Sequence, residues 1–158
     1  MRRIAVSGHR TLTEPTILGV TMAIQAALHE IGTAVRGLSC LAAGADQIFA
    51  RAVLEAGGHV EAIIPAARYP DGMRPPERAG YEALLPRAAA VHRLPFADPT
   101  GQAHLAAGAF MIGRADELWA VWDGEPARGC GGTADVVACA RDRGVPVRLI
   151  WPAGARRG

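Results

Sequence analysis

The chain has 158 residues, half of them apolar, which is enough for one domain with its own core and excludes an intrinsically disordered protein. All 17 basic residues are arginine, so lysine chemistry such as a Schiff base or a Walker-type phosphate lysine is excluded. The net charge is only +2 and the arginines are scattered, so no nucleic-acid-binding surface is indicated. Arginine does suit forked recognition of phosphate.

The cysteines and the hydropathy pattern favour a cytoplasmic protein. Cys40, Cys130 and Cys139 are odd in number and have no C-x-x-C spacing, which argues against a disulfide framework. No stretch has the length and continuity of a membrane span. The histidines and cysteines also lack the spacing of metal ligands, and we expect neither a metal nor a separate cofactor.

The first half of the chain alternates short apolar runs with stretches of helical periodicity. A helix start at Thr13-Glu14-Pro15 is followed by apolar residues at helical spacing, and Gly32 ends the pattern. The predicted elements are a strand at 4–6, a helix to about 30, a strand at 37–41, a helix that stops at 57–58, and a strand at 59–64.

The second half begins with a loop at 66–76, rich in proline, glycine and charge, which would act as a lid or a dimer contact. Thr100 or Asp98 caps a later helix. Trp119 and Trp122 lie in a buried strand and are predicted to be core residues. The predicted elements are helices at about 77–85, 101–113 and 134–143, and strands at 90–94, 118–122 and 145–151.

Alternation of strands and helices with short connections is typical of a doubly wound sheet. The predicted fold class is therefore α/β: a single Rossmann-like, doubly wound, mostly parallel sheet flanked by helices. We expect this domain to span residues 1–153, followed by a frayed tail at 154–158.

Glycine-bearing loops follow three of the predicted strands. In a doubly wound sheet the ligand lies outside the carboxyl ends of the strands, so these loops should gather at one edge. The loop before the 134–143 helix would form a phosphate cradle, because glycine admits a close approach and a helix N-terminus favours an anion. The alternative is that the glycines only make tight connections. The loops are Ser7-Gly8-His9-Arg10, Gly44-Ala45-Asp46 and Gly131-Gly132-Thr133.

Several side chains in these loops are candidates for binding, and each also has a structural alternative. Arg10 would pair with a phosphate, or hold the neighbouring loop. His9 would contact ligand, or fix its own loop through its ring nitrogens. Asp46 would hold a ribose hydroxyl, or only favour the helix start. Thr133 would donate to phosphate, or only cap its helix.

The pair Asp123-Gly124 follows the buried strand at 118–122. Asp123 would accept from ribose hydroxyls or bind a cation at the ligand edge, but Asp-Gly is also an ordinary turn. Asp135 is the only acid within the junction between the glycine-rich loop and the following helix.

Three stretches together resemble the SLOG superfamily, a Rossmann-like group that includes LOG-type phosphoribohydrolases and the DprA/Smf domain. They are V-S-G-H-R at 6–10, L-A-A-G-A-D at 41–46 and A-V-W-D-G-E-P-A-R-G-C-G-G-T-A-D-V-V at 120–137, so the resemblance covers nearly the whole chain. It implies binding or sensing of a nucleotide or a nucleotide-derived ligand, such as a nucleoside monophosphate or an ADP-ribose-like molecule. It also implies a homodimer. The usage of alanine, arginine and glycine without lysine is typical of a GC-rich bacterial genome, so we expect a bacterial origin.

The enzymes of this group carry P-G-G-x-G-T-x-x-E, whose glutamate serves cleavage of the N-glycosidic bond. In this chain Arg128, Gly129 and Cys130 stand for P-G-G, and the glutamate position is Val136. A phosphoribohydrolase that releases a base from a nucleoside 5′-monophosphate is the alternative function. It would have to use Asp135 or Asp123 as its acid, and Asp135 is rotated about 100° from the expected helix face.

Overall fold

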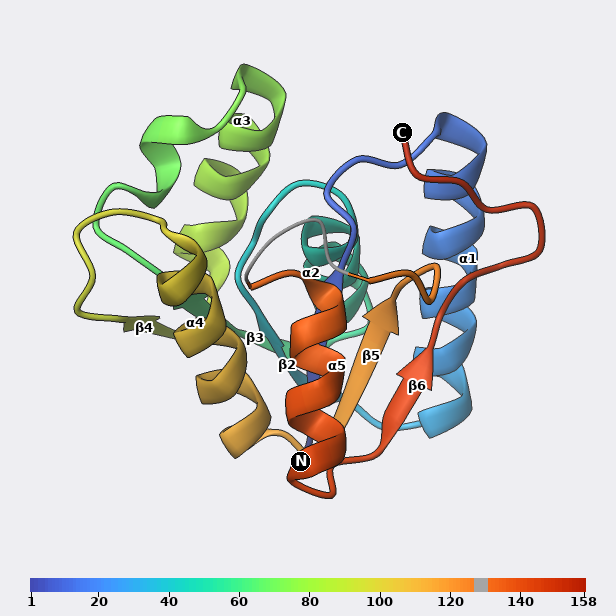
Figure 1. The fold of residues 1–158 in the computed structure, drawn as a ribbon. Coiled ribbons are helices and arrows are strands. Elements are labelled where there is room, and N and C mark those ends of the chain that lie inside the picture. The colour runs from blue at the N-terminus through green and yellow to red at the C-terminus, as the bar shows by residue number, and fades with distance from the viewer. Residues whose placement is uncertain (127–130) are drawn as a thin grey trace.

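A parallel sheet with helices on both faces forms the protein (Figure 1). The computed structural model describes residues 1–126 and 131–158. The strands are β1 (Arg2–Gly8), β2 (Val35–Ser39), β3 (His59–Ile64), β4 (Ala90–Arg93), β5 (Glu117–Val121) and β6 (Val147–Leu149). The α-helices are α1 (Glu14–Ile31), α2 (Ala45–Glu55), α3 (Pro75–Leu84), α4 (Gly101–Arg114) and α5 (Thr133–Asp142). Two short 3-10 helices, η1 (Tyr69–Gly72) and η2 (Leu85–Arg87), flank α3.

The six strands are ordered β4-β3-β2-β1-β5-β6, and every pairing is parallel. From β1 the chain moves outward through β2 and β3 to β4, and then returns through α4 to pair β5 with the other side of β1. The order therefore reverses between β1 and β5, and their carboxyl ends border the crevice in which such sheets bind ligands. The predicted α/β doubly wound class is confirmed.

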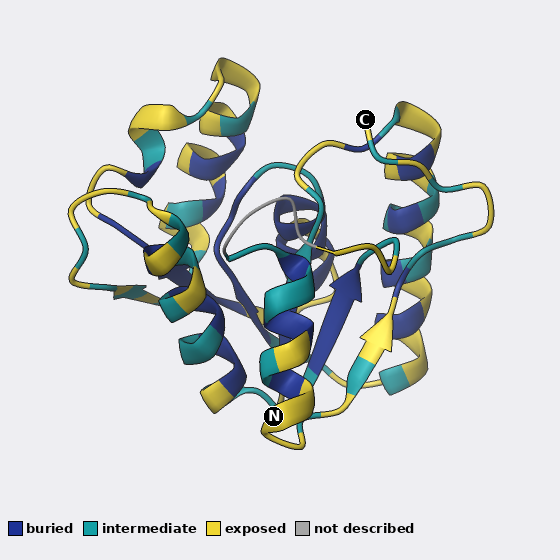
Figure 2. Cartoon of the chain, in the orientation of Figure 1, coloured by how far each residue is buried: buried dark blue, intermediate teal, exposed yellow. Residues whose placement is uncertain are grey.

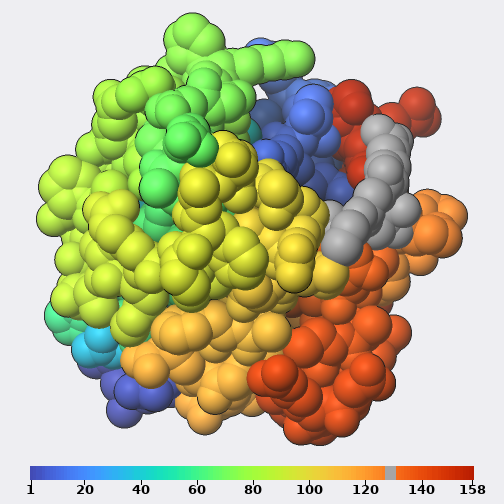
Figure 3. All heavy atoms as spheres, turned by 60° about the vertical axis from the view of Figure 1, so that its left-hand side comes forward, coloured from blue at the N-terminus to red at the C-terminus, as the bar shows by residue number. Residues whose placement is uncertain are grey.

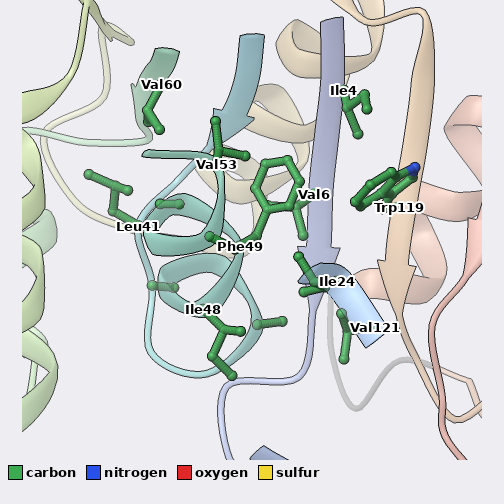
Figure 4. Close-up of a cluster of buried hydrophobic side chains, with 14 of the residues drawn as sticks. Ile4, Val6, Ile24, Leu41, Ile48, Phe49, Val53, Val60, Trp119 and Val121 are labelled. Atoms are coloured by element: carbon green, nitrogen blue, oxygen red, sulfur yellow. The ribbon is translucent and has the colours of Figure 1, made fainter. Parts of the chain in front are cut away.

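Helices cover both faces because alternate side chains of the buried strands point to opposite sides. One cluster of buried residues joins the sheet to α1, α2 and α3, and a second joins it to α4 and α5. In Figure 4, Phe49 of α2 points toward Val6 of β1, and its ring meets the edge of Trp119 of β5 at a centroid distance of 5.8 Å. Figure 2 shows the same division, with the central strands buried and the outer faces of the helices exposed.

Helix boundaries follow the local signals in the sequence. Thr13 precedes α1, and Gly32 adopts the left-handed conformation with φ of 75° that ends it. Thr100 rather than Asp98 caps α4, because its hydroxyl oxygen accepts a hydrogen bond from the Ala103 N–H at 3.2 Å. Within the described ranges, no helix is long and apolar enough to cross a membrane.

The C-terminal segment differs from the expected frayed tail. The Gly158 N–H donates to the Thr11 carbonyl at 2.9 Å, and the Arg156 N–H donates to the Thr16 hydroxyl at 2.7 Å. Arg157 forms an antiparallel bridge with Leu12. Residues 154–158 are therefore tied to the start of α1, and this pairing between distant segments leaves no signal in the local sequence.

Candidate functional site

The first glycine-bearing loop leaves the end of β1 through a space that only glycine fills. A Cβ at Gly8 would lie 2.3 Å from the Cβ of Ala45 and 2.7 Å from the Cβ of Val121. Both distances are far shorter than a van der Waals contact, so any side chain here would push α2 or β5 away. Gly8 thus brings the end of β1 between α2 and β5.

His9 holds the turn that follows β5. Its Nε2 accepts a hydrogen bond from the Asp123 N–H at 3.2 Å and lies 3.3 Å from the Asp123 carboxylate. The ring also packs edge-on against Trp151, with 5.4 Å between the ring centroids. These contacts correspond to the loop-fixing alternative for His9, although the residue also lines the cavity described below.

Arg10 follows directly and is exposed. Among the described residues its guanidinium makes neither a hydrogen bond nor an ion pair. Its charge still acts on neighbours: it lowers the pKa of Asp46, against the effect of burial, and together with burial it lowers that of His104. The guanidinium is therefore available to an anion.

The second loop supports the first. Gly44 has φ of +74°, and a Cβ there would lie 2.4 Å from the carbonyl oxygen of His9. The Ala45 N–H donates to that same carbonyl at 3.3 Å. Gly44 and Ala45 thus lie behind the first loop and fix its course, and neither lines the cavity.

Asp46 does line the cavity, and it is buried. Its Oδ2 accepts a hydrogen bond from the Ala42 N–H at 3.3 Å. Burial raises the pKa of this carboxyl to about 7, although the charge of Arg10 and the Ala42 hydrogen bond oppose the increase. Asp46 therefore changes its protonation state near neutral pH.

The third loop places the N-terminus of α5 at the cavity. Gly131 has φ of +87°, and a Cβ there would lie 2.6 Å from the Cβ of His104. Gly132, Thr133 and Ala134 line the cavity, and the first-turn N–H groups of a helix have no partners within it. The Ser7 hydroxyl meets the Thr133 hydroxyl at 3.3 Å, which joins the β1 and α5 loops.

The two candidate catalytic acids are both engaged in local structure. Asp135 accepts a hydrogen bond from the Gly131 N–H at 2.8 Å, which closes the loop before α5. Asp123 accepts one from the Glu125 N–H at 3.0 Å and lies 3.4 Å from Arg157. Neither of the two lines the cavity, and nor does Gly124, whereas Val136, which the SLOG resemblance aligns with the glutamate of those enzymes, does.

These loops border one cavity of about 420 Å³ at the carboxyl ends of β1 and β5. The volume lies within the range of pockets that take small molecules. The predicted residues that line it are Ser7, Gly8, His9, Arg10, Asp46, Gly131, Gly132 and Thr133. Arg128, Gly129 and Cys130 lie outside the described residues.

Sequence reasoning missed other residues of the cavity wall. Trp122 was predicted to be in the core, but it is half-buried at the cavity and its Nε1 donates to the Glu125 carbonyl at 2.8 Å. The position of Trp122 at the carboxyl end of a central strand was the available signal. Further lining residues are Cys40, directly after β2, Tyr69 of η1, His104 of α4 and Arg157 of the C-terminal segment.

Tyr69, within the segment 66–76, lines the cavity. The Ala67 and Arg68 N–H groups donate to the carbonyls of Phe96 and Ala97, both at 2.9 Å. Figure 3 shows these two segments, green and yellow, side by side on one face. The Tyr69 ring meets His104 edge-on, with 5.9 Å between centroids.

No protein-family model matches the sequence. A search of curated proteins also finds no match. Within the described residues no group of three or more histidine, cysteine, aspartate or glutamate side chains is placed to hold a metal.

Solved structures share the fold. DNA processing protein A (DprA) from Streptococcus pneumoniae superposes with a TM-score of 0.71 at 20% identity, over 94% of this chain and 50% of that one. DprA from Helicobacter pylori, described for its single-stranded DNA binding mode, gives 0.67 at 14% identity, over 94% and 64%. The molybdenum cofactor binding protein from Rippkaea orientalis gives 0.60 at 16% identity, over 94% and 75%.

The chain thus spans half the length of the S. pneumoniae protein. The fold implied by the SLOG resemblance is confirmed, and DprA is one of the proteins that the resemblance named. At these identities the likeness concerns the fold alone, and the single-stranded DNA and the molybdenum cofactor are ligands of those other proteins.

Proposed function

We propose that the chain binds or senses a nucleotide or a nucleotide-derived ligand, of the size of a nucleoside monophosphate or an ADP-ribose-like molecule. One observation carries the proposal: Arg10, without an ion-pair partner among the described residues, shares a cavity with the N-terminus of α5. A guanidinium and a helix N-terminus are two elements that proteins use to bind phosphate.

The cavity favours a small molecule over a polymer as partner. Its volume of about 420 Å³ suits a small ligand, and the arginines of the chain are not gathered into a stripe. The proposal includes a cytoplasmic location and a homodimer. The homodimer rests on the SLOG resemblance alone and is tested by light scattering of the purified protein.

Base release is the alternative to pure binding. Asp123 and Asp135 are engaged by backbone N–H groups outside the cavity lining, and Val136 lines the cavity at the position of the family glutamate. These contacts favour binding without hydrolysis. Free base that appears from a bound nucleoside monophosphate would reverse this preference.

The test compares wild type with Arg10→Ala in a thermal-shift panel of AMP, ADP-ribose, NAD, cyclic nucleotides and a single-stranded oligonucleotide. A ligand at about 100 times its Kd adds about 2.7 kcal/mol of stability, which is readily seen. The matched control is Arg87→Ala, because Arg87 is also exposed but lies outside the cavity lining.

We expect Arg10→Ala to weaken nucleotide binding roughly 10- to 100-fold, the range for a lost hydrogen bond to a charged group. Arg87→Ala should leave the affinity unchanged. Equal affinity in Arg10→Ala and wild type would refute the phosphate role, and a response to the oligonucleotide alone would refute the small-molecule partner.

A further inference from the structure

Tyr69 has a buried hydroxyl that is unpaired among the described residues. The residue is 4% exposed, and its hydroxyl makes no hydrogen bond with any described residue. The ring itself is held firmly by edge-to-face contacts with Tyr81 and His104, at centroid distances of 5.8 and 5.9 Å. Buried polar groups are nearly always paired in folded proteins, so an orphaned hydroxyl at a cavity points to a missing ligand.

The neighbours of this hydroxyl belong to the same cavity. The groups that act electrostatically on the Tyr69 phenol are Cys40, Asp46, Arg10 and Glu77, and the first three line the cavity with it. Glu77 lies behind them, where it accepts a hydrogen bond from the Ala43 N–H at 2.9 Å. Tyr69 therefore shares the cavity with three of these groups, and its hydroxyl lies buried within the cavity wall.

Tyr69 and Cys40 are the uncharged buried side chains of the wall, whereas the buried Asp46 ionises near neutral pH and Arg10 is charged at the exposed part. Burial raises the pKa of the Tyr69 phenol well above its ordinary value and also raises that of the Cys40 thiol, so both are neutral at physiological pH. A phosphate should therefore bind at Arg10 and the α5 N-terminus, where positive charge is available, rather than at this wall. An uncharged ring with hydrogen-bond acceptors on its edge suits the buried wall.

We propose that Tyr69 recognises the base of the nucleotide, its hydroxyl donating a hydrogen bond to a ring nitrogen or a carbonyl oxygen of that base. The inference rests on the proposed function, because it assumes that a nucleotide occupies the cavity. It assigns phosphate to Arg10 and the α5 loop, and the base to the wall formed by Tyr69 and Cys40.

The test is Tyr69→Phe, which removes only the hydroxyl. The matched control is Tyr81→Phe, because Tyr81 is equally buried and touches Tyr69, but its hydroxyl bonds Arg93 and it does not line the cavity. Calorimetry measures the affinity of each variant for AMP, for ADP-ribose, and for ribose 5-phosphate, which has no base.

We expect Tyr69→Phe to weaken AMP and ADP-ribose about five- to tenfold, as for one lost hydrogen bond between neutral groups, and to leave ribose 5-phosphate within twofold. Tyr81→Phe should change none of the three affinities. The melting temperature of unliganded Tyr69→Phe should equal or exceed that of wild type, because the hydroxyl has no partner to lose. Tyr81→Phe should melt lower.

Analogues of AMP give a second measurement that needs no stable variant. In the 1-, 3- and 7-deaza forms a ring nitrogen is replaced by C–H. The form that lacks the accepting nitrogen should bind wild type about five- to tenfold more weakly than AMP does. The affinity for that analogue should be the same in Tyr69→Phe as in wild type, because the hydrogen bond is already absent.

The outcomes separate the two proposals. Unchanged nucleotide affinity in Tyr69→Phe, with a loss in Arg10→Ala, overturns the base contact and leaves the nucleotide site standing. An equal loss of AMP and ribose 5-phosphate in Tyr69→Phe also overturns the base contact. No binding by any nucleotide overturns both.

Discussion

Replacement of Asp46 by asparagine should stabilise the protein, and increasingly so as the pH rises. Asp46→Asn removes the charge but keeps an oxygen that accepts from the Ala42 N–H, which Oδ2 of Asp46 now bonds at 3.3 Å. Burial raises the pKa of this carboxyl from 3.8 to about 7 in the folded protein, against the opposing charge of Arg10. The folded state therefore resists ionisation of a group that ionises freely in the unfolded chain.

The sign and size of the effect follow from this difference. A raised pKa means that stability is fully present below the unfolded value of 3.8 and is lost as the pH rises through about 7. At about 1.4 kcal/mol per pH unit, the total loss is about 4 kcal/mol. Asparagine has no such loss, so the stability gap between variant and wild type should widen by roughly 2–3 kcal/mol from pH 5 to pH 8.

Urea unfolding at several pH values measures the gap, because linear extrapolation of the free energy of unfolding to zero urea gives its value in water. Asp123→Asn is the control of opposite sign. Burial alone would raise the pKa of Asp123, but the Glu125 N–H and the charges of His9 and Arg157 hold it below its ordinary value. Loss of this charge should destabilise at neutral pH. A gap for Asp46→Asn that stays constant from pH 5 to pH 8 would refute the reasoning.

Two glycines of the candidate site should reject alanine for different reasons. Gly131→Ala forces a side chain to φ of +87° and against His104, whereas Gly124→Ala, at φ of +85°, meets open space among the described residues. Both variants should lose about 1–2 kcal/mol of stability for the backbone conformation, measured by urea unfolding. Gly131→Ala should lose more, because of its contact with His104. Equal losses would show that the loop before α5 relaxes. Gly8→Ala should lose about 1–3 kcal/mol by overpacking between α2 and β5, while Gly72→Ala, which meets no atom within 4 Å, should be nearly neutral. A folded Gly8→Ala as stable as wild type would contradict the tight passage of β1.

Most of the secondary structure was predictable because its signals are local. The predicted strand at 59–64 is β3 (His59–Ile64), and α1 begins after Thr13 and ends before Gly32, as expected. The strand expected at 37–41 is β2 at Val35–Ser39 instead, because Leu41 takes φ of +58° and leaves the sheet. The strand expected at 145–151 is paired only at Val147–Leu149, where it meets β5.

The gathering of the glycine-bearing loops at one edge was also predictable, since parallel strands carry their carboxyl ends to the same side. Ser7, Arg10 and Thr133 line one cavity although β1 and α5 are far apart in the chain. Gly44 and Ala45 belong to the same edge but lie behind the first loop, because α2 starts against the backbone of His9. Sequence spacing placed the loops, and it could not say which side of each loop faces the cavity.

The sequence by itself determined the order of strands and helices, the α/β class and the edge at which the glycine loops meet, because periodicity, caps and turns act within a few residues. Only the tertiary structure decided that Tyr69 joins the cavity wall, that the segment 154–158 pairs with the start of α1, and that Asp46 is buried. These properties arise from contacts between distant segments and from exclusion of water. Neither is encoded in any short stretch of the chain.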